Sequence, residues 1–301
     1  MPGVEANREA WDRRYRWERE GEEWSAAWGS ADNQWYGSLF PRLRAFLPAD
    51  RILEIAPGHG RWTHYLKDQA RTLSVVDLSA SCIETCRRRF AGCAHIGYHV
   101  NDGCSLPMIA DRSVDFAFSY DSLVHVERDV MAGYLRELAR VLAPDGVAFL
   151  HHSNLAALRG VRMYLAIKDR FTGAESMDWI RAPESAGADR PPAARRLANV
   201  LYERLAAGGL FPNVFWRGRT VSAEVIEELA QAAGLQCIAQ EKVNWYGRIL
   251  LDCMTTLTRP GSRFARPNRV LANRAFMAEA AGIRRRGELY AAAGAASEAR
   301  L

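Results

Sequence analysis

The sequence lacks any long uninterrupted apolar run. Its 301 residues contain no stretch close to the roughly 18 apolar residues that a membrane-spanning helix needs. The first 20 residues are charged and have no apolar centre of the kind found in secretory signals. These absences predict a cytoplasmic protein with no membrane partner.

Cysteine is sparse, and the cysteines are dispersed along the chain. The six cysteines include no C-x-x-C pair, and only Cys82 and Cys86 share one face of a predicted helix. This pattern is typical of free thiols in a reducing compartment, not of a disulfide framework or a zinc site. No set of carboxylates and histidines has clear metal-binding spacing either, so we predict no metal.

Lysine is also scarce. Only three of the 40 basic residues are lysines, and the net charge is +5. The short arginine clusters at 87–89 and 284–286 lie in helical patterns, so we interpret them as solvated helix faces. With no aromatic–basic stripe and no attached RNA-binding module, we expect no nucleic-acid partner.

What the chain does contain is an alternation of short apolar runs and helical patterns. Strands that alternate with helices of this length predict βαβ units and a parallel sheet covered on both faces. The predicted strands are 51–56, 72–79, 95–100, 113–120 and 147–153, and the helices between them are 61–70, 79–92 and 129–146.

The rest of the chain completes this architecture. A capped helix at 222–234 precedes two strands, 235–245 and 248–259, whose short connection requires antiparallel pairing. We therefore predict a doubly wound, mostly parallel, seven-stranded α/β sheet of Rossmann-like type with an antiparallel last strand. The predicted parts are an N-terminal helical cap (1–49), the sheet domain (50–258) with a lid insertion at about 154–219, and a helical tail (259–301).

A glycine turn follows the first predicted strand, in the segment Glu54-Ile55-Ala56-Pro57-Gly58-His59-Gly60. Glycine lets the backbone approach a ligand closely, because it has no Cβ and adopts positive φ at little cost. The next helix points its N-terminal amides at the same place. A plain tight turn is the alternative interpretation of Gly58 and Gly60.

Polar residues also follow the second and third strands. Asp77 ends the second strand, where an acid typically accepts hydrogen bonds from ribose hydroxyls. Asn101-Asp102-Gly103 follows the third strand, and a carboxylate there suits an adenine amino group. Because open α/β sheets bind ligands at this edge, these positions predict a nucleoside site. The alternative for Asp77 and Asp102 is helix or turn capping.

The details of the turn favour a cationic ligand. A pyrophosphate-binding fingerprint requires glycine or alanine three residues after Gly60, where this chain has Thr63. Glu54, four residues before Gly58, does not help to bind an anion. An acid there suits a ligand with an ammonium group, such as the methionine end of S-adenosylmethionine.

At this point the sequence resembles the class I methyltransferase family. The family motif acid-x-Gly-x-Gly-x-Gly is matched by Glu54-x-Ala56-x-Gly58-x-Gly60, with alanine in place of the first glycine. The resemblance covers roughly 50–155 and 220–258. It implies S-adenosylmethionine as cofactor, with Gly58 and Gly60 beneath it, Asp77 at the ribose and Asp102 at the adenine. The remaining candidates for cofactor contact are Leu78, Asn101, Gly103 and Ser119.

Three histidines at strand ends are candidates for a general base, since the pKa of histidine lies near 6.5. His125 follows the fourth strand, and His151 and His152 end the fifth. Adjacent residues of a strand point to opposite faces, so only one of the latter pair is expected to enter the cleft. Asp121 is expected to orient a histidine or the acceptor, or else to cap the following helix.

The tryptophans of the N-terminal segment have two interpretations. Trp11, Trp17 and Trp24 are spaced six or seven residues apart, which is typical of a helical core stripe. Trp28 and Trp35 flank a loop-like stretch and are expected to close over the cofactor, where an aromatic face attracts a sulfonium. The lid aromatics Trp179, Phe211, Phe215 and Trp216, with Arg217, are expected either to contact an acceptor or to bury the lid against the sheet.

Taken together, these patterns predict a methyltransferase acting on a hydroxyl of a small-molecule acceptor. The segments HHSN, NW and LLDC resemble methyltransferases of surface polysaccharides or specialised metabolites, including antibiotic intermediates. A small-molecule N-methyltransferase is the close alternative, and a nicotinamide-dependent oxidoreductase and a catalytically silent interaction module are remote ones. The sequence leaves a homodimer open.

Overall fold

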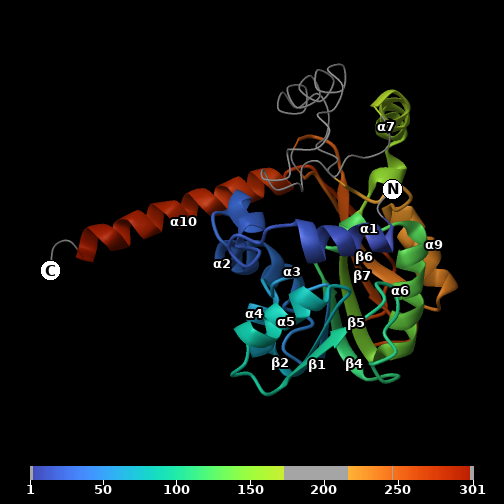
Figure 1. The fold of residues 1–301 in the computed structure, drawn as a ribbon, viewed down its shortest axis with the longest axis horizontal. Coiled ribbons are helices and arrows are strands. Elements are labelled where there is room, and N and C mark those ends of the chain that lie inside the picture. The colour runs from blue at the N-terminus through green and yellow to red at the C-terminus, as the bar shows by residue number, and fades with distance from the viewer. Residues whose placement is uncertain (1–2, 173–215, 246, 299–301) are drawn as a thin grey trace.

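The protein, described here from a computed structural model, is built around one twisted sheet with helices on both faces (Figure 1). The structure describes residues 3–172, 216–245 and 247–298. The sheet has eight strands in the order β3-β2-β1-β4-β5-β7-β6-β8. The strands are β1 (Ala49–Ile55), β2 (Ala70–Asp77), β3 (Ile96–Val100), β4 (Val114–Ser119), β5 (Leu142–Ser153), β6 (Gln236–Val243), β7 (Asp252–Thr258) and β8 (Arg269–Asn273).

The doubly wound prediction is confirmed, with one strand more than expected. Strands β1 to β5 pair in parallel, and β7 lies antiparallel between β5 and β6, as the short connection required. The additional strand, β8, pairs in parallel with β6 inside the tail that we had expected to be helical. Four of its five residues are exposed, Val270 and Leu271 among them, because it forms the edge of the sheet.

The long helices follow the sequence pattern, while the N-terminal segment departs from it. Ser79 caps α5 and Ser222 caps α9 through their side-chain oxygens, as the sequence indicated. The N-terminal segment forms short α, 3₁₀ and π turns. The helical elements are α1 (Val4–Arg8), η1 (Glu9–Arg14), η2 (Glu22–Trp28), α2 (Ala31–Gln34), η3 (Trp35–Leu39), α3 (Phe40–Leu43), α4 (Thr63–Leu66), η4 (Lys67–Gln69), α5 (Ala80–Arg89), η5 (Leu123–His125), α6 (Arg128–Val141), η6 (Leu155–Ala157), α7 (Arg159–Thr172), α9 (Ala223–Ala232) and α10 (Phe276–Glu298).

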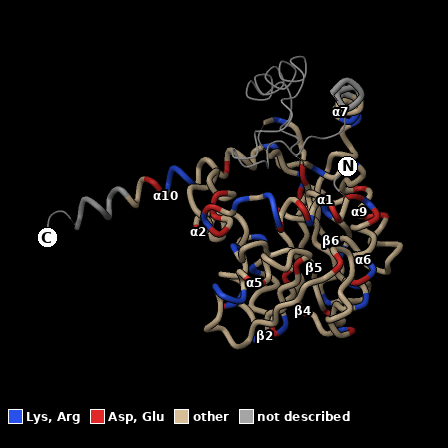
Figure 2. The backbone as a smooth tube through the Cα atoms, viewed as in Figure 1, with Lys and Arg blue, Asp and Glu red and all other residues tan. Residues whose placement is uncertain are grey.

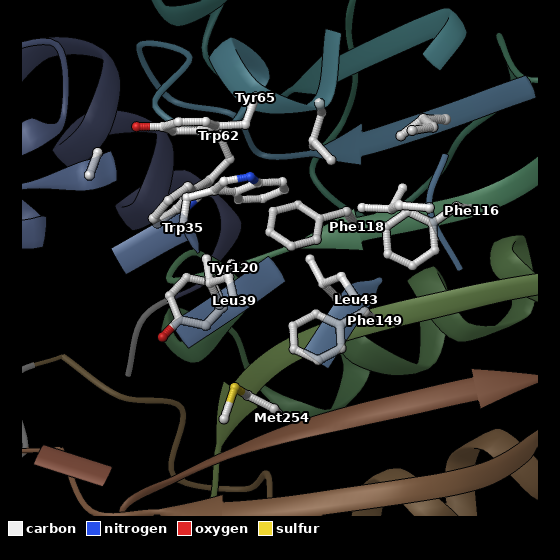
Figure 3. Packing of buried hydrophobic residues seen from close by; sticks show 14 of the residues in the cluster. Trp35, Leu39, Leu43, Trp62, Tyr65, Phe116, Phe118, Tyr120, Phe149 and Met254 are labelled. Carbon is white, nitrogen blue, oxygen red and sulfur yellow. The ribbon is translucent and has the colours of Figure 1, made fainter. Parts of the chain in front are cut away.

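Two apolar cores cover the two faces of the sheet, and alternation along the strands divides residues between them. Phe116 and Phe118 of β4 face the core that includes Trp35 and Trp62, whereas Ala117 faces the core beneath α6 and α9. Figure 3 shows the first core, in which the Trp35 ring stacks on Tyr65 at 5.0 Å. This packed core supports the sheet, in which the carboxyl ends of β1, β2 and β4 lie at one edge.

The surface of the described chain carries both signs of charge. Figure 2 shows basic and acidic residues interspersed along the backbone. Arg87 and Arg88 on α5 and the arginines at 284–286 on α10 are exposed, in agreement with their interpretation as solvated faces. Among the described residues, no helix combines the length and apolarity needed to cross a membrane, and no group of three potential metal ligands occurs.

Candidate functional site

A cavity opens at the carboxyl ends of β1, β2 and β4, beneath the N-terminal segment. It encloses about 990 Å³ of empty space, part of it open to solvent. Its walls combine residues that are far apart in sequence. They are Asn7, Trp11, Trp17, Gly21, Trp24, Ala56, Pro57, Gly58, Arg61, Trp62, Asp77, Leu78, Cys82, Gly103, Tyr120, Asp121, Ser122, Leu123, His125, Val126, Tyr134, Arg217 and Trp245.

The turn after β1 has the backbone conformation that the glycine pattern indicated. Gly58 and Gly60 have φ values of 58° and 84°, in the left-handed region that favours glycine. Ala56 is also left-handed, with φ of 57°. This conformation costs an alanine roughly 1–2 kcal/mol, which explains why glycine is the residue expected at this place in the motif. The chain therefore keeps the shape of the turn at some cost.

The two glycines make different close contacts. A Cβ at Gly58 would lie 2.6 Å from the Trp17 ring, and a Cβ at Gly60 would lie 2.5 Å from the Phe90 ring. Gly58 lines the cavity, whereas Gly60 does not. The missing side chain of Gly60 instead lets Phe90 and Cys86 pack closely against the turn. Of the two glycines, only Gly58 is thus placed to lie against a ligand.

Glu54 is buried behind the turn and does not line the cavity. Its Oε2 accepts a 2.6 Å hydrogen bond from the Thr63 hydroxyl, and its Oε1 has no hydrogen-bond partner. Burial raises the pKa of Glu54 to about 8, although the Thr63 hydrogen bond acts in the opposite direction. Thr63, which argued against a pyrophosphate fingerprint, therefore also has a structural task at the end of β1.

Asp77 lies at the end of β2 and lines the cavity. Its Oδ2 accepts from the Gly58 amide at 3.1 Å, and its Oδ1 accepts from the Ser79 amide at 2.9 Å. Burial raises the pKa of Asp77 to about 6, while these amides act in the opposite direction. Each carboxylate oxygen has two lone pairs, so the carboxylate can accept further hydrogen bonds from a ligand.

The segment after β3 lies at the adenine end of the predicted site. Gly103 lines the cavity, but Asp102 and Asn101 do not. Asp102 accepts from the amides of Cys104 and Ser105, the capping alternative considered above, and Asn101 donates to the Tyr134 hydroxyl. The adenine role of Asp102 stays a prediction. Leu78 lines the cavity, whereas Ser119 is buried below it.

Among the described residues, His125 is the histidine that lines the cavity. Its Nδ1 lies 2.7 Å from the carbonyl oxygen of Trp216. A carbonyl can only accept, so Nδ1 carries the proton and Nε2 keeps its lone pair. Burial, followed by the positive charge of Arg217, lowers the pKa of His125 to about 4. The ring is therefore neutral at pH 7 and has a proton-accepting nitrogen.

His151 and His152 point to opposite faces of β5, as alternation required. His152 is fully buried, and its two ring nitrogens contact the Ser153 carbonyl and the Thr255 hydroxyl, so it lies away from the cavity. His151 stacks on Tyr120 at 4.5 Å. Its Nδ1 accepts from the backbone amide of Asp121 at 3.1 Å. Neither position favours the role of base that the sequence suggested for these two residues.

Two buried ion pairs border the cavity. Arg61 donates to Asp121 at 2.9 Å, and Arg217 binds Asp252 through two hydrogen bonds of 2.9 and 2.8 Å. Burial opposes the charge of Asp252, but Arg217 and His151 outweigh it and hold the pKa of Asp252 below its usual range. The side chain of Asp121 thus pairs with Arg61, and its backbone amide orients His151.

The tryptophan assignment from the sequence is reversed. Trp28 and Trp35 are 1% exposed and belong to the core, and neither lines the cavity. The three residues that we had assigned to the core, Trp11, Trp17 and Trp24, line the cavity instead. The helical spacing misled because the segment is broken into short π and 3₁₀ turns, with Gly21 in the left-handed region (φ of 91°) between them. Among the predicted lid residues, Trp216 and Arg217 are described, whereas Trp179, Phe211 and Phe215 lie outside the described residues.

Several cavity residues had no signal in the sequence. Trp62, Tyr120, Tyr134 and Trp245 belong to separate elements, and each alone is an ordinary core aromatic. Arg61 follows the glycine turn directly, so its place beside the site was accessible from the motif. Asn7 was not, since it reaches the site only through the folded N-terminal segment, where it donates to the His125 carbonyl at 3.0 Å.

Comparisons with known proteins relate part of the chain to methyltransferases. Residues 52–146 match a family model described as a methyltransferase domain. No protein with a curated description matches the sequence significantly. This segment is therefore similar to methyltransferase domains, and the cofactor of such a domain is S-adenosylmethionine.

Solved structures share the fold at low sequence identity. PKMT2 from Rickettsia typhi superimposes with a TM-score of 0.50 at 16% identity, covering 79% of this chain and 55% of that chain. The PH0226 protein from Pyrococcus horikoshii OT3 gives a TM-score of 0.49 at 18% identity, covering 77% and 93%. The CcbJ methyltransferase from Streptomyces caelestis gives 0.48 at 16%, covering 76% and 96%.

Proposed function

We propose that this S-adenosylmethionine-dependent methyltransferase transfers the methyl group to a hydroxyl of a small molecule, with His125 as the general base. The observation that carries the proposal is the tautomer of His125, which lines the cavity with Nδ1 tied to the Trp216 carbonyl. Hydroxyl acceptors must lose a proton during methylation, whereas amines need less help. A neutral, oriented imidazole therefore favours a hydroxyl.

The residues of the cavity fit the cofactor. Gly58 gives a surface without a side chain, and the Asp77 carboxylate beside it suits ribose hydroxyls. Leu78, Gly103 and Tyr134 line the same cavity as Asp77. Their apolar or flat surfaces suit the adenine ring of the cofactor. When bound, S-adenosylmethionine supplies a methyl group activated on a positively charged sulfur. The indoles of Trp17 and Trp24 offer faces that attract such a cation.

The chain's own residues would then bring donor and acceptor together. The aromatic walls exclude water, and the ion pair between Arg61 and Asp121 holds the wall beside the turn. Positioning of the two reactants is the main source of acceleration in such a displacement. Nε2 of His125 receives the hydroxyl proton as the new bond forms.

A variant pair tests the role of His125. His125→Gln preserves much of the side-chain volume and a donor for the Trp216 carbonyl but removes the base. We expect transfer to a hydroxyl acceptor to fall by about 10²–10⁴-fold. The affinity for S-adenosylhomocysteine, measured by calorimetry, should change less than threefold.

The matched control is His152→Gln, in a histidine that lies away from the cavity, measured in the same assay on folded protein. Its kcat should stay close to that of the unmodified enzyme. A His125→Gln enzyme that retains full kcat, or a product methylated on nitrogen, would contradict the proposal.

A further inference from the structure

We propose that the acceptor hydroxyl is carried on a flat aromatic ring, as in a phenol, and that this ring packs against Trp11 beside His125. This inference rests on the proposed function and narrows it to one substrate class. It depends on the shape and polarity of the part of the cavity next to His125.

Aromatic side chains surround the base. The ring centroid of Trp11 lies 5.2 Å from that of His125, with 42° between the planes, and Trp216 lies 5.7 Å from His125. Tyr120, Trp62 and Trp245 add three further aromatic walls to the same cavity. Aromatic rings pair favourably at such distances, contributing roughly 0.5–1.5 kcal/mol beyond burial. Walls of this kind favour a flat, apolar acceptor.

Several polar groups in the walls already bind one another, whereas Nε1 of Trp62 and the hydroxyl of Tyr120 are buried without a hydrogen-bond partner among the described residues. Arg61 pairs with Asp121, and Arg217 pairs with Asp252. The Ser122 hydroxyl donates to the Ala56 carbonyl at 2.9 Å. A polyhydroxylated acceptor such as a sugar needs several hydrogen bonds to replace those it makes with water, and each unmet group costs about 1–3 kcal/mol. The described walls therefore suit a molecule with few polar groups.

The strength of the base points the same way. Burial and Arg217 lower the pKa of His125 to about 4, which makes its imidazole a weak base. A phenolic hydroxyl has a pKa of about 10. An alkyl alcohol is about as weak an acid as water, whose pKa is about 15.7. A weak base in an apolar site thus removes a proton far more readily from a phenol.

The reaction balances without any further reactant. The phenolic O–H proton passes to Nε2 of His125, and an electron pair on the oxygen forms the new O–CH3 bond. The S–CH3 bond breaks, and its electron pair stays on sulfur. The products are an aryl methyl ether, a neutral thioether and an imidazolium that returns its proton to solvent.

A matched pair of probes tests whether the acceptor hydroxyl must be carried on an aromatic ring. 2-Naphthol and decahydro-2-naphthol have the same carbon skeleton, but only the first is flat and acidic. Calorimetry on the full-length protein saturated with S-adenosylhomocysteine measures binding without turnover, and mass spectrometry measures methyl transfer from the cofactor. We expect 2-naphthol to bind at least tenfold more tightly, and only 2-naphthol to be methylated on oxygen. Methyl glucopyranoside serves as the sugar probe and should not bind.

Variants at Trp11 locate the site. Trp11→Leu should weaken 2-naphthol binding about 3- to 10-fold, the loss of one aromatic pair, while Trp11→Phe should restore most of it. Thermal unfolding of both variants reports whether the fold is intact, and Trp11→Phe keeps a ring in the cluster with Trp17 and Trp24.

Equal binding of 2-naphthol and decahydro-2-naphthol, or no binding of either, would overturn the assignment of an aromatic acceptor. Preferential binding and methylation of the sugar would overturn it too, while leaving the hydroxyl function standing. Methylation of 2-naphthylamine but of no hydroxyl would instead remove the proposed function itself.

Discussion

The ring of His125 combines burial with one fixed hydrogen bond, and this sets its behaviour with pH. The Trp216 carbonyl holds Nδ1 protonated at 2.7 Å, and burial disfavours a second proton on Nε2. A base must be unprotonated to work. A lowered pKa therefore extends the active range toward acid, whereas an ordinary histidine titrates near 6.5.

We expect kcat with saturating cofactor and acceptor to stay level from pH 8 down to pH 5.5. The reason is that the pKa of His125 is lowered to about 4, so the base form persists throughout this range. The measurement is a pH profile of initial rates, with enzyme integrity checked at each pH. A profile that loses half its rate near pH 6.5 would show that His125 keeps its ordinary pKa and would count against this environment.

Glu54 gives a second residue-level prediction, on stability. Its pKa is raised to about 8 in the folded protein, from 4.5 ordinarily. The folded state therefore holds its proton more tightly, so this contribution to stability is complete below pH 4.5 and is lost as the pH rises through 8. A difference of one unit between the folded and unfolded pKa values of a group corresponds to about 1.4 kcal/mol of unfolding free energy.

Replacing Glu54 with Gln removes the ionisation but keeps an acceptor for Thr63. Between pH 5 and pH 8, unmodified protein should lose on the order of 3 kcal/mol of unfolding free energy relative to Glu54→Gln. Denaturant unfolding at both pH values measures this difference. Asp77, whose pKa is also raised, is present in both proteins, so the comparison reports Glu54 together with its interaction with Asp77. Parallel stability curves would show that Glu54 is ionised in the folded state.

Among the elements, the N-terminal segment 4–28 covers the cavity and is held by polar contacts. Asp12 on η1 accepts from the Ser79 hydroxyl at 2.6 Å and from the amide and hydroxyl of Ser81 at 3.1 and 2.7 Å. These serines open α5, directly after the Asp77 strand. The segment is built of short turns, so these few contacts, with the Trp11 ring cluster, hold it over the site.

Asp12→Ala should loosen this segment. We expect faster amide hydrogen exchange in residues 4–28 and about tenfold weaker binding of S-adenosylhomocysteine, since hydrogen bonds to a charged group contribute about 1.5–3 kcal/mol. Glu5→Ala makes the same charge change at a side chain that is 81% exposed, and it should alter neither quantity. Unchanged exchange in Asp12→Ala would mean that the aromatic contacts alone hold the segment.

For the molecule as a whole, the N-terminal segment meets the start of α10 next to a residue of the cavity wall. The Phe276 ring at the start of α10 lies 5.7 Å from Trp28 of η2 and 6.0 Å from Trp245, which lines the cavity. Farther along, α10 leaves the body of the protein, as Figure 1 shows, and Leu289 is exposed. The first turns of α10 therefore belong to the core, and its later part does not.

Substitutions along α10 should reflect this division. Phe276→Ala should cost about 3–5 kcal/mol of unfolding free energy, because it opens a cavity between two buried tryptophans. Leu289→Ala should cost less than about 0.5 kcal/mol. Denaturant unfolding of both variants measures the contrast. Similar losses in the two variants would show that the later part of α10 is also packed.

The sequence predicted the parts of the site that depend on local chain geometry. The left-handed turn through Gly58, Asp77 at the next strand end and His125 after the fourth strand all follow from strand–turn–helix units. Parallel strands bring their carboxyl ends to one edge, so these residues converge without knowledge of the packing. Strand alternation likewise separated His151 from His152.

The tertiary structure decided which of several similar residues enter the cavity. Nothing local distinguishes Trp11 from Trp28, yet the folded protein places the first in the cavity wall and the second in the core. The pairing of β8 was equally invisible, because this five-residue edge strand leaves Val270 and Leu271 exposed and so lacks the alternation of a half-buried strand. Local sequence determines turns and periodicity, but burial depends on partners distant in the chain, and these are chosen only when the whole core packs together.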